Sequence, residues 1–481
     1  MRVLKFGGTS LADGRRIRHV ARLVRRAAKP RRVIVVASAM AGVTDRLCGL
    51  IEDAVAARPV DRGVGAVERQ HLEALDNLDP THRWPAVESI RRRIYELRRD
   101  LQKIVSFGAC PDHIRDRVMA TGERLSVTVL TAVLRSFGCP ARVVDGSEVV
   151  LTDNRFGEAR VDHVATRRAC AGLRERPTVE VPVVTGFVGA DPKGRTTTLG
   201  RSGSDFSAAL LGAALDAERV EIWTDVDGVL TAPPDIVSEA SRISRLSYEE
   251  AAELSHFGAT VLHPRTVEPL VAGRIPIIVR NTLDPTRPGT EIGPNEPTSP
   301  RVVAVSAVPE AKVLSLTPIA ERSAAPERSP LVLAPSDEIL MACSASSGGS
   351  ALFVTLEAKA ADVAGRLASA ANITVTDNGP ASLVALVGHN LGSQPWAAGR
   401  ALEALGRRGL TVRAVAAGSS PHALTILVER DELETVLTTV HDVLGLKGDL
   451  GPERPVEVVS SELMIEEALV TEASTQHRRA S

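Results

Sequence analysis

The chain has 481 residues, 44% of them hydrophobic, which predicts about three globular domains with a core in each. Its 58 Lys and Arg residues balance 59 Asp and Glu residues, and only 3% of the residues are aromatic. This composition excludes an overall attraction to polyanions and leaves few rings for stacking on bases. We therefore expect no nucleic-acid partner.

The sequence also argues against secretion and membrane insertion. No apolar run approaches the roughly 18 residues that a membrane span requires, and the run after Met1 is too brief for the apolar part of a signal peptide. The five cysteines are widely spaced and form no C-x-x-C pair, so neither a disulfide framework nor a zinc site is predicted. We expect a cytoplasmic protein with no membrane partner, and we assign no metal-ligating residues.

Strand-like and helix-like segments alternate through the N-terminal part of the chain. The first apolar run breaks at Gly7-Gly8, a helical pattern among arginines follows, and a second, β-branched run comes next. This alternation predicts an α/β domain with a mostly parallel sheet. The strand-like runs lie at residues 3–6, 32–37, 141–144, 181–185, 219–223 and 275–279.

Two polar stretches stand out from this pattern. Residues 66–105 are charged and helix-periodic, and their basic cluster Arg91-Arg92-Arg93 is interpreted as a solvated helix face. Residues 281–300 are rich in proline and glycine and show no periodicity, which predicts an inter-domain linker. We place the main domain boundary in that linker.

The C-terminal part again alternates strand-like and helical segments. The strand-like runs lie at residues 351–356, 383–387 and 424–428, and the helical patterns lie at 361–371, 397–408 and 433–443. Their order predicts two small α+β modules, an approximate repeat of the βαββαβ kind. The tail from residue 453 lacks the apolar content to pack, so we expect it to fray.

The first glycine turn is a candidate phosphate site. Lys5 ends the first strand-like run, and the next residues are Gly7, Gly8, Thr9 and Ser10. Glycines let backbone N–H groups approach a phosphate, and the lysine supplies a positive charge. A tight turn with a Thr or Ser helix cap explains the same residues. The chain contains no Walker motif.

Three further clusters carry polar chemistry. The segment 194–205 joins glycines and threonines to Arg201, which can grip a carboxylate, although a long flexible loop is the alternative. Asp225 and Asp227 follow a strand, where nucleotide or magnesium binds in open sheets, and an Asx turn explains Asp227 equally well. Glu123 stands at a predicted helix start, where capping is the default explanation. No Ser/His/Asp triad or H-E-x-x-H is visible.

In order, these segments resemble the aspartate kinase (aspartokinase) family from residue 3 to about residue 292. The resemblance implies an amino-acid-kinase fold, a mostly parallel sheet sandwiched by helices. It also implies ATP with Mg²⁺ as cofactors, and transfer of the γ-phosphoryl group to the β-carboxylate of L-aspartate, giving 4-phospho-L-aspartate. The matching stretches are VLKFGGTS, VVASAMAGVTD, TGERLS, GFVGADPKGRTTTLGRSGSD, EIWTDVDGV, SYEEAAELSHFGATVLHPRTVEPL, IPIIVRNT and GTEI.

The same resemblance implies roles for single residues. It implies that Lys5 lies over the transferring phosphoryl group and is catalytic together with Arg201 and Asp205. It implies that aspartate is bound by Ser38, Thr44, Glu123, Arg201 and Ser204. It implies that the nucleotide is bound by Lys5, Gly7, Gly8, Thr9, Ser10, Thr224, Asp225, Leu230, Asp235 and Thr260.

The departures from the family pattern gather on the nucleotide side. Leu230 replaces a tyrosine, Pro233-Pro234-Asp235 replaces an Asp-Pro-Arg run, Thr260 replaces a lysine, and Ser202 replaces a glycine. Three interpretations stay open: a weakened ATP site, an altered nucleotide preference, or compensation by residues such as Arg265 or Lys193.

The C-terminal repeat resembles the paired, ferredoxin-like ACT domains with which aspartate kinases sense end-product amino acids. The first copy lacks the usual glycine-rich effector segment, which predicts weak or absent inhibition by lysine and threonine in a pathway-dedicated enzyme. ACT pairing across subunits implies a homo-oligomer, most simply a dimer. The implied domains are a catalytic domain (1–298), a divergent first ACT-like domain (303–380), a second ACT domain (381–452) and a tail (453–481).

Two alternatives to an aspartate kinase are weighed. Kinases of acetylglutamate, glutamate or carbamate share the fold, but the ordered motifs and the tandem C-terminal modules suit them poorly. A ligand-sensing regulatory subunit, impaired on its nucleotide side, is the alternative from a different class.

Overall fold

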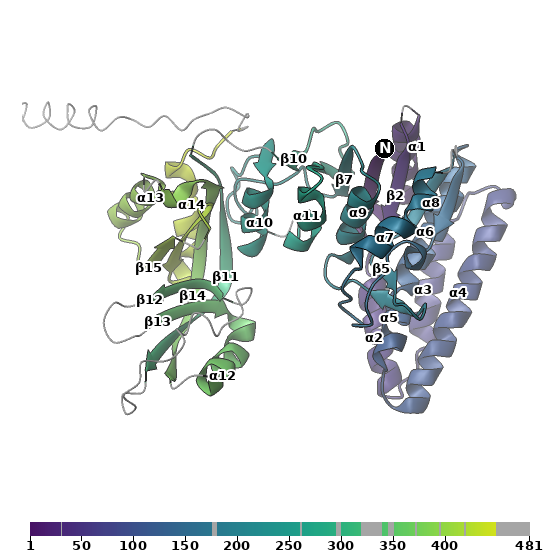
Figure 1. The fold of residues 1–481 in the computed structure, drawn as a ribbon, viewed down its shortest axis with the longest axis horizontal. Helices are drawn as coiled ribbons and strands as arrows, with labels where there is room; N and C mark the ends of the chain where they lie inside the picture. The colour runs from purple at the N-terminus through teal and green to yellow at the C-terminus, as the bar shows by residue number, and fades with distance from the viewer. Residues whose placement is uncertain are drawn as a thin grey trace, which may run out of the picture. The chain divides into compact units, whose positions relative to one another are not determined.

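A computed structural model describes most of the chain as two compact units. The first unit comprises Met1–Leu230 and Arg242–Glu296, and the second comprises Thr231–Ser241 and Pro297–Ser481. Figure 1 labels the helices and strands of both units. The described residues are 1–29, 31–175, 180–259, 262–294, 300–318, 339–344, 351–370, 373–393, 396–417 and 420–448.

The first unit is built on one eight-stranded sheet in the order β3-β4-β2-β1-β7-β9-β10-β8. Every pairing is parallel except that of β9 with β10. This confirms the predicted mostly parallel sheet, and all six predicted strands are present. The bounds are β1 (Arg2–Phe6), β2 (Val33–Ala37), β3 (Ala141–Val144), β4 (Val181–Thr185), β7 (Arg219–Thr224), β8 (Arg245–Ser247), β9 (Ile277–Asn281) and β10 (Thr290–Gly293).

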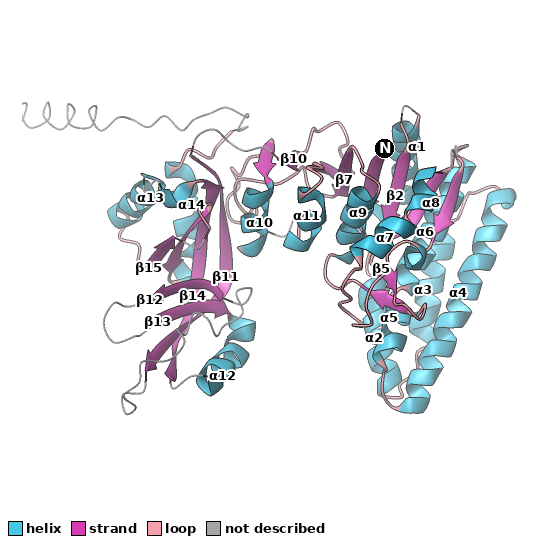
Figure 2. Cartoon of the chain, in the orientation of Figure 1, coloured by secondary structure: helices cyan, strands magenta, loops and turns pink. Residues whose placement is uncertain are grey.

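Helices pack on this sheet. Helices α1 and α6 contact each other and β2, α4 packs against α6, and α9 contacts β1 and β7 with α11 behind it. Figure 2 shows α4 as a long helix among the helices of this unit. The bounds are α1 (Gly14–Ala28), α2 (Val43–Val55), α3 (Asp61–Ala74), α4 (Pro80–Phe107), α5 (Asp112–Met119), α6 (Thr121–Ser136), α7 (His163–Ala169), α8 (Ala171–Glu175), α9 (Gly203–Ala214), α10 (Tyr248–His256) and α11 (Pro264–Val271).

Two local predictions are wrong. Thr9 and Ser10 do not cap the first helix, because they form a short 3₁₀ turn, and Asp13 caps α1 by accepting a hydrogen bond from the Arg16 N–H at 2.8 Å. The stretch 281–300 is not a structureless linker, because β10 lies inside it. Thr290 holds β10 in the sheet by donating to the Ile243 carbonyl at 2.6 Å. A strand of four residues is too short to show periodicity.

The second unit is built on a six-stranded sheet in the order β12-β13-β11-β14-β16-β15, antiparallel throughout. The long strands β11 and β14 pair along nearly their whole length. The bounds are β11 (Arg301–Pro318), β12 (Ile339–Ser344), β13 (Ala351–Leu356), β14 (Ile373–His389), β15 (Val412–Ala417), β16 (Ala423–Val428), α12 (Ala360–Ala370), α13 (Trp396–Arg407) and α14 (Leu433–Val443).

The two predicted C-terminal modules share these long strands. One apolar cluster includes Phe353 and Leu367 on one end of the sheet, and a separate cluster includes Ile426 and Leu437 on the other. The boundary predicted at 380/381 falls inside β14, so each module is completed by strands that also serve its neighbour. The predicted tail, 453–481, lies outside the described residues.

One segment of the predicted first domain is built into the second unit. In this segment, 231–241, Ala232 and Val237 join the apolar cluster beneath α14. The Thr231 hydroxyl lies 2.9 Å from Nε2 of the buried His441, and the Thr231 carbonyl accepts from the Val305 N–H at 2.8 Å. The chain therefore passes through the second unit before it completes the sheet of the first.

Within the described ranges, the structure contains no helix that is long and apolar enough to cross a membrane.

Candidate active site

Lys5 and Asp205 form an ion pair at the carboxyl end of the central strand β1. Lys5 Nζ lies 2.6 Å from Asp205 Oδ1, and the side chains are 10% and 17% exposed. Asp205 stands in the first turn of α9, where the helix dipole favours a carboxylate. Two residues that are far apart in the sequence are thus brought together.

The glycine turn after β1 is shaped by close approaches. The Gly7 N–H donates to the Trp223 carbonyl at 3.2 Å. A Cβ on Gly8 would stand 3.1 Å from the Ala39 carbonyl, and one on Gly7 would stand 3.5 Å from Lys5 Nζ. Because Gly7 and Gly8 carry no side chains, the turn packs closely against Ala39 and leaves the space beside the Lys5 ammonium group free.

The two hydroxyl residues of this turn, Thr9 and Ser10, differ in their exposure to solvent. Thr9, at the end of the turn, is exposed, as a residue that contacts phosphate must be. Ser10 is buried, and its Oγ lies 2.7 Å from Oγ1 of Thr282. The Ser10 side chain therefore stabilises the packing of the turn, and only its backbone is left to face a ligand.

Glu123 is brought to the end of β2 by the close approach of α6. Its Oε1 accepts a hydrogen bond from the Ala39 N–H at 3.2 Å, next to Ser38. A Cβ on Gly122 would stand 2.8 Å from the Cβ of Ala39, so only glycine permits this approach. The capping interpretation of Glu123 is wrong, because the carboxylate reaches across to another segment. Thr44 is exposed in the first turn of the neighbouring helix α2.

The Glu123 carboxyl is poised between its two protonation states. The residue is 4% exposed, and burial raises its pKa to about 7 against the opposing effect of the Ala39 N–H. Glu123 forms no ion pair within the described residues, although the charge of Arg124 acts on it from a distance, so it would gain from a ligand that brings a positive charge. An ammonium group is such a ligand.

The segment 194–205 is ordered rather than a long flexible loop. It begins in the antiparallel pair β5 (Val188–Ala190) and β6 (Thr196–Thr198) and ends in α9. A Cβ on Gly186 would stand 2.6 Å from Ser204 Oγ, which places that hydroxyl against the end of β4. Arg201 is exposed in the turn before α9, and its charge contributes, after burial and Arg265, to a lowered pKa of His263.

Ser202 adopts the left-handed conformation that the family's glycine suits. Its φ is 54° and its ψ is 23°. A non-glycine residue in this region costs about 1–3 kcal/mol, whereas the greater flexibility of an unfolded glycine offsets about 0.5–1 kcal/mol. We therefore expect Ser202→Gly to raise the free energy of unfolding by about 1 kcal/mol. Urea denaturation of both proteins measures this, and an unchanged or lower midpoint contradicts it.

On the nucleotide side the predicted residues are dispersed. Thr224 and Asp225 lie together at the end of β7, with the Thr224 hydroxyl donating to Asp225 Oδ1 at 3.0 Å. Asp227 instead accepts from Asn281 Nδ2 at 2.7 Å and pairs with Arg287 at 3.3 Å. Leu230 is half-buried in the first unit and Asp235 is exposed in the second, whereas Thr260 lies outside the described residues.

Of the two suggested compensating cations, Arg265 is closer to the site. It stands on α11 and lies over the ring of Phe206, the neighbour of Asp205, at 4.9 Å. Lys193 is exposed in the β5–β6 hairpin. Sequence reasoning missed Gly122 and Gly186, although both occur in quoted motifs. Their signal is a glycine beside a polar residue at the point where a helix or loop meets a strand.

Family models match both parts of the chain. The model of the amino acid kinase family matches residues 1–281, and a model of the ACT domain matches residues 384–444.

Several proteins of known activity are similar in sequence. Bifunctional aspartokinase/homoserine dehydrogenase 2 of Zea mays is 32% identical over 464 residues, which are 91% of this chain and 50% of that protein. Lysine-sensitive aspartokinase 3 of Escherichia coli is 38% identical over 292 residues, 60% of this chain and 63% of that protein. The chain thus spans about half the length of the bifunctional relatives that it matches.

Two solved structures of Escherichia coli aspartokinase III resemble the whole fold. The structure in complex with aspartate and ADP has a TM-score of 0.76 and 29% identity, covering 92% of this chain and 99% of its own. The structure in complex with lysine and aspartate has a TM-score of 0.73 and 31% identity, with the same coverage. The predicted fold class, an α/β kinase domain followed by ACT-type structure, is confirmed.

Proposed function

We propose, from the premise that this chain belongs to the amino acid kinase family as an aspartokinase with C-terminal ACT domains, that it phosphorylates L-aspartate. The reaction transfers the γ-phosphoryl group of ATP to the β-carboxylate and gives 4-phospho-L-aspartate. The observation that carries this proposal is the Lys5–Asp205 pair at the carboxyl end of β1, beside the glycine turn. The similar Escherichia coli structure in complex with aspartate and ADP supports the same choice of substrates.

Such a reaction mainly requires that two anions be brought together. A carboxylate oxygen of aspartate attacks the γ-phosphorus, the bond to the bridging oxygen breaks, and ADP leaves with that electron pair. The nucleophile is already ionised, so no general base is needed, and catalysis rests on positioning and charge neutralisation. Lys5 supplies a fixed positive charge, and Asp205 holds the ammonium group in place.

The substrate end of the site suits an amino acid. Glu123 would accept the α-ammonium group, because it is a buried carboxylate at the end of β2. Arg201 would bind a carboxylate of aspartate through two parallel hydrogen bonds. Ser38, Thr44 and Ser204 would add hydroxyl contacts around the same molecule.

The residues fit a magnesium ion that is carried by the phosphates. Among the described residues no cluster of three or more His, Cys, Asp or Glu side chains could hold a metal ion alone. In kinases Mg²⁺ keeps several waters and binds through substrate phosphates with one or two carboxylates. Asp225, exposed after β7, is the candidate carboxylate. When bound, Mg²⁺ would neutralise part of the charge on the phosphates, with Asp225 helping to hold it.

Leu230 and Asp235 depart from the family pattern on the nucleotide side, and Asp235 lies in the second unit. Hydroxylamine trapping of aspartyl phosphate, run with ATP, GTP and CTP in turn, tests the proposal. We expect hydroxamate to form with ATP and aspartate. Failure to consume any of the three triphosphates in the presence of aspartate contradicts the proposal and favours the ligand-sensing subunit.

Weak feedback by amino acids is part of the proposal. Lysine is bound by the Escherichia coli relative, but this sequence lacks the usual glycine-rich effector segment in its first ACT-like domain. We expect lysine and threonine, each at low millimolar concentration, to change the rate by less than about fivefold, the lower end of common allosteric coupling. Titration of each amino acid into the kinase assay measures this, and strong inhibition by either one contradicts it.

The setting that we propose is a cytoplasmic homo-oligomer, most simply a dimer that pairs through its ACT domains. All five cysteines are free thiols, which suits a reducing compartment. Sedimentation equilibrium of the full chain measures the subunit number directly.

A further inference from the structure

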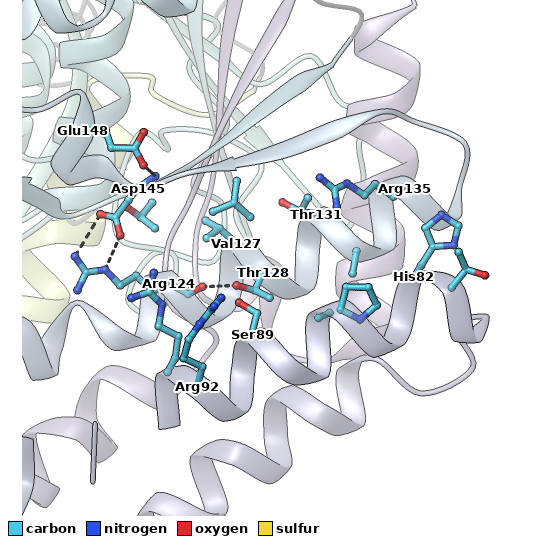
Figure 3. A pocket seen from close by; sticks show the side chains of 17 residues that line it. His82, Ser89, Arg92, Arg124, Val127, Thr128, Thr131, Arg135, Asp145 and Glu148 are labelled. Atoms are coloured by element: carbon cyan, nitrogen blue, oxygen red, sulfur yellow. Dashed lines mark hydrogen bonds and ion pairs between the residues drawn. The ribbon is translucent and has the colours of Figure 1, made fainter. Parts of the chain in front are cut away.

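A cavity of about 330 Å³ lies between α4, α6 and β3, apart from the glycine turn and the Lys5–Asp205 pair. Figure 3 shows the side chains that line it. We call it the α4–α6 pocket, and its charged lining residues are Arg92, Arg93, Arg124, Arg135, Asp145 and Glu148. Glu123 faces Ala39, whereas the next residue on the helix, Arg124, faces this pocket.

Two polar helix faces meet in the α4–α6 pocket. On α6, Arg124, Thr128, Thr131 and Arg135 recur at steps of four, three and four residues, which places them on one face. This face is unusual, because α6 buries most of its other residues. Figure 3 shows Arg92 extending from α4 toward the Arg124 and Thr128 end of that face.

The pocket carries a surplus of positive charge. Its four arginines exceed its two carboxylates by two formal charges, and one of the four, Arg93, is paired with Glu96 outside the lining at 3.0 Å. Both carboxylates are already engaged: Asp145 accepts two hydrogen bonds from Arg124, at 2.7 and 3.3 Å, and Glu148 accepts from the Asp145 N–H at 3.3 Å. Asp145 is thus paired with Arg124, and among the described residues neither acid forms an ion pair with Arg92.

The same lining contains a buried hydroxyl that has no hydrogen-bond partner among the described residues. Thr131 is 3% exposed, and its Oγ1 makes no hydrogen bond within the part of the chain that the structure describes. A buried polar atom without a partner is costly, so it points to a ligand that would satisfy it. This observation is independent of the surplus charge.

Apolar side chains form one part of the remaining lining, beside the polar Thr81, His82, Ser89 and Thr185. Val127 on α6 and Val143 on the free edge of the sheet both line the pocket, and Val143 is an exposed apolar side chain. A cavity of this size, apolar on one side with a few converging polar groups, has the character of a small-molecule site.

We propose that the α4–α6 pocket binds a small organic anion, whose phosphate or carboxylate group lies between Arg92 and Arg124 and whose apolar part lies along Val127 and Val143. Arg92 can bind either kind of anion through paired hydrogen bonds, whereas Arg124, whose Nε and Nη2 already donate to Asp145, would contribute Nη1. The basic cluster at residues 91–93 is therefore more than a solvated helix face. Arg92 and Arg93 line the pocket, whereas Arg91 is exposed and does not.

Isothermal titration of the full chain tests the proposal with three probes: inorganic phosphate, phenyl phosphate and phenylacetate. We expect saturable binding of at least one phenyl-bearing probe, tighter than that of inorganic phosphate. The tighter phenyl probe identifies the ligand as a phosphate ester or a carboxylate. Phosphate probes also bind nucleotide sites, so each titration is repeated with Lys5→Ala, which should leave binding in the α4–α6 pocket unchanged.

Variants of the pocket separate it from general charge effects. Arg92→Gln should weaken binding about 10-fold or more, because it removes a charge-assisted contact. Arg91→Gln is the matched control and should leave the affinity unchanged. Thr131→Val should weaken binding while leaving the thermal midpoint equal or higher, since it removes an unsatisfied hydroxyl.

Several outcomes would overturn the proposal. These are no saturation by any of the three probes, equal weakening by Arg91→Gln and Arg92→Gln, or loss of binding in Lys5→Ala with retention in Arg92→Gln. If no anion binds and Arg92→Gln changes the sedimentation of the protein, the pocket is a contact between copies of the chain and the proposal fails.

Discussion

Replacing Lys5 with alanine should lower the turnover number by about 10²- to 10³-fold, the loss typical of removing one preorganised electrostatic contact. Lys5 Nζ is held 2.6 Å from Asp205, in a site that is largely shielded from water. The positive charge is therefore fixed before the anions arrive, and water cannot replace it at equal strength. Hydroxamate formation with saturating ATP and aspartate measures the loss.

The controls for Lys5→Ala address folding and specificity. The variant leaves Asp205 without its cation, so circular dichroism and a thermal melt must accompany the assay. The double variant Lys5→Met with Asp205→Asn removes both charges, and should fold while staying inactive. Lys29→Ala removes an exposed lysine at the end of α1 and should be fully active. Turnover of Lys5→Ala within a few-fold of the unaltered protein would refute the proposed role.

Local patterns were sufficient to predict the core of the kinase domain. The β-branched run of β2 is buried at every position, as a strand covered on both faces must be. Because parallel strands end at one edge of the sheet, the sequence predicts a ligand site beside Asp225 after β7, whereas the place of Ser38 after β2 is implied only by the family resemblance. The position of Lys5, at the end of a central strand, follows from the same argument.

Long-range pairing could not be predicted in this way. The segment 231–241 contributes Val237 to the core of the second unit, which depends on α14, some 200 residues later in the chain. The sharing of β11 and β14 between two modules likewise depends on register, not on local pattern. Ser10 and Thr131 both carry hydroxyls in helical or turn segments. Only the packing of other elements determines that Ser10 has a hydrogen-bond partner and that Thr131 has none in the described part of the chain.

Glu123→Gln should lower kcat/KM for aspartate about 10²-fold or more, through KM, because a buried charge pair with the substrate ammonium is lost. The amide keeps an oxygen that can accept from the Ala39 N–H, so the backbone contact of Glu123 is retained. Steady-state kinetics with aspartate as the varied substrate measure the change. Glu52→Gln, which alters an exposed carboxylate on α2, is the matched control and should leave KM unchanged.

The pH dependence of catalysis should also reflect the titration of Glu123. Burial raises the pKa of Glu123 to about 7, so its carboxyl is protonated below that pH and loses its attraction for an ammonium group. We expect kcat/KM for aspartate to rise with pH up to about 7 and then level off. The rise should be absent in Glu123→Gln. A rise that persists unchanged in the variant would assign the titration to another group.

Although Glu123→Gln should bind aspartate less well, it should be more stable than the unaltered protein at high pH. The pKa of Glu123 is higher in the folded chain, about 7, than its ordinary value of 4.5, so the folded state binds the extra proton between these limits and loses stability as the pH rises through them. The shift corresponds to a loss of about 3 kcal/mol in the free energy of unfolding, fully expressed above pH 7.

Glu123→Gln removes this cost. The variant should therefore be more stable than the unaltered protein by up to that amount at pH 8, and by little at pH 4.5. Denaturation at both values measures the difference. Greater stability with impaired aspartate binding would identify Glu123 as a strained carboxylate retained for its ligand, whereas lower stability of the variant at pH 8 would show that its role is structural.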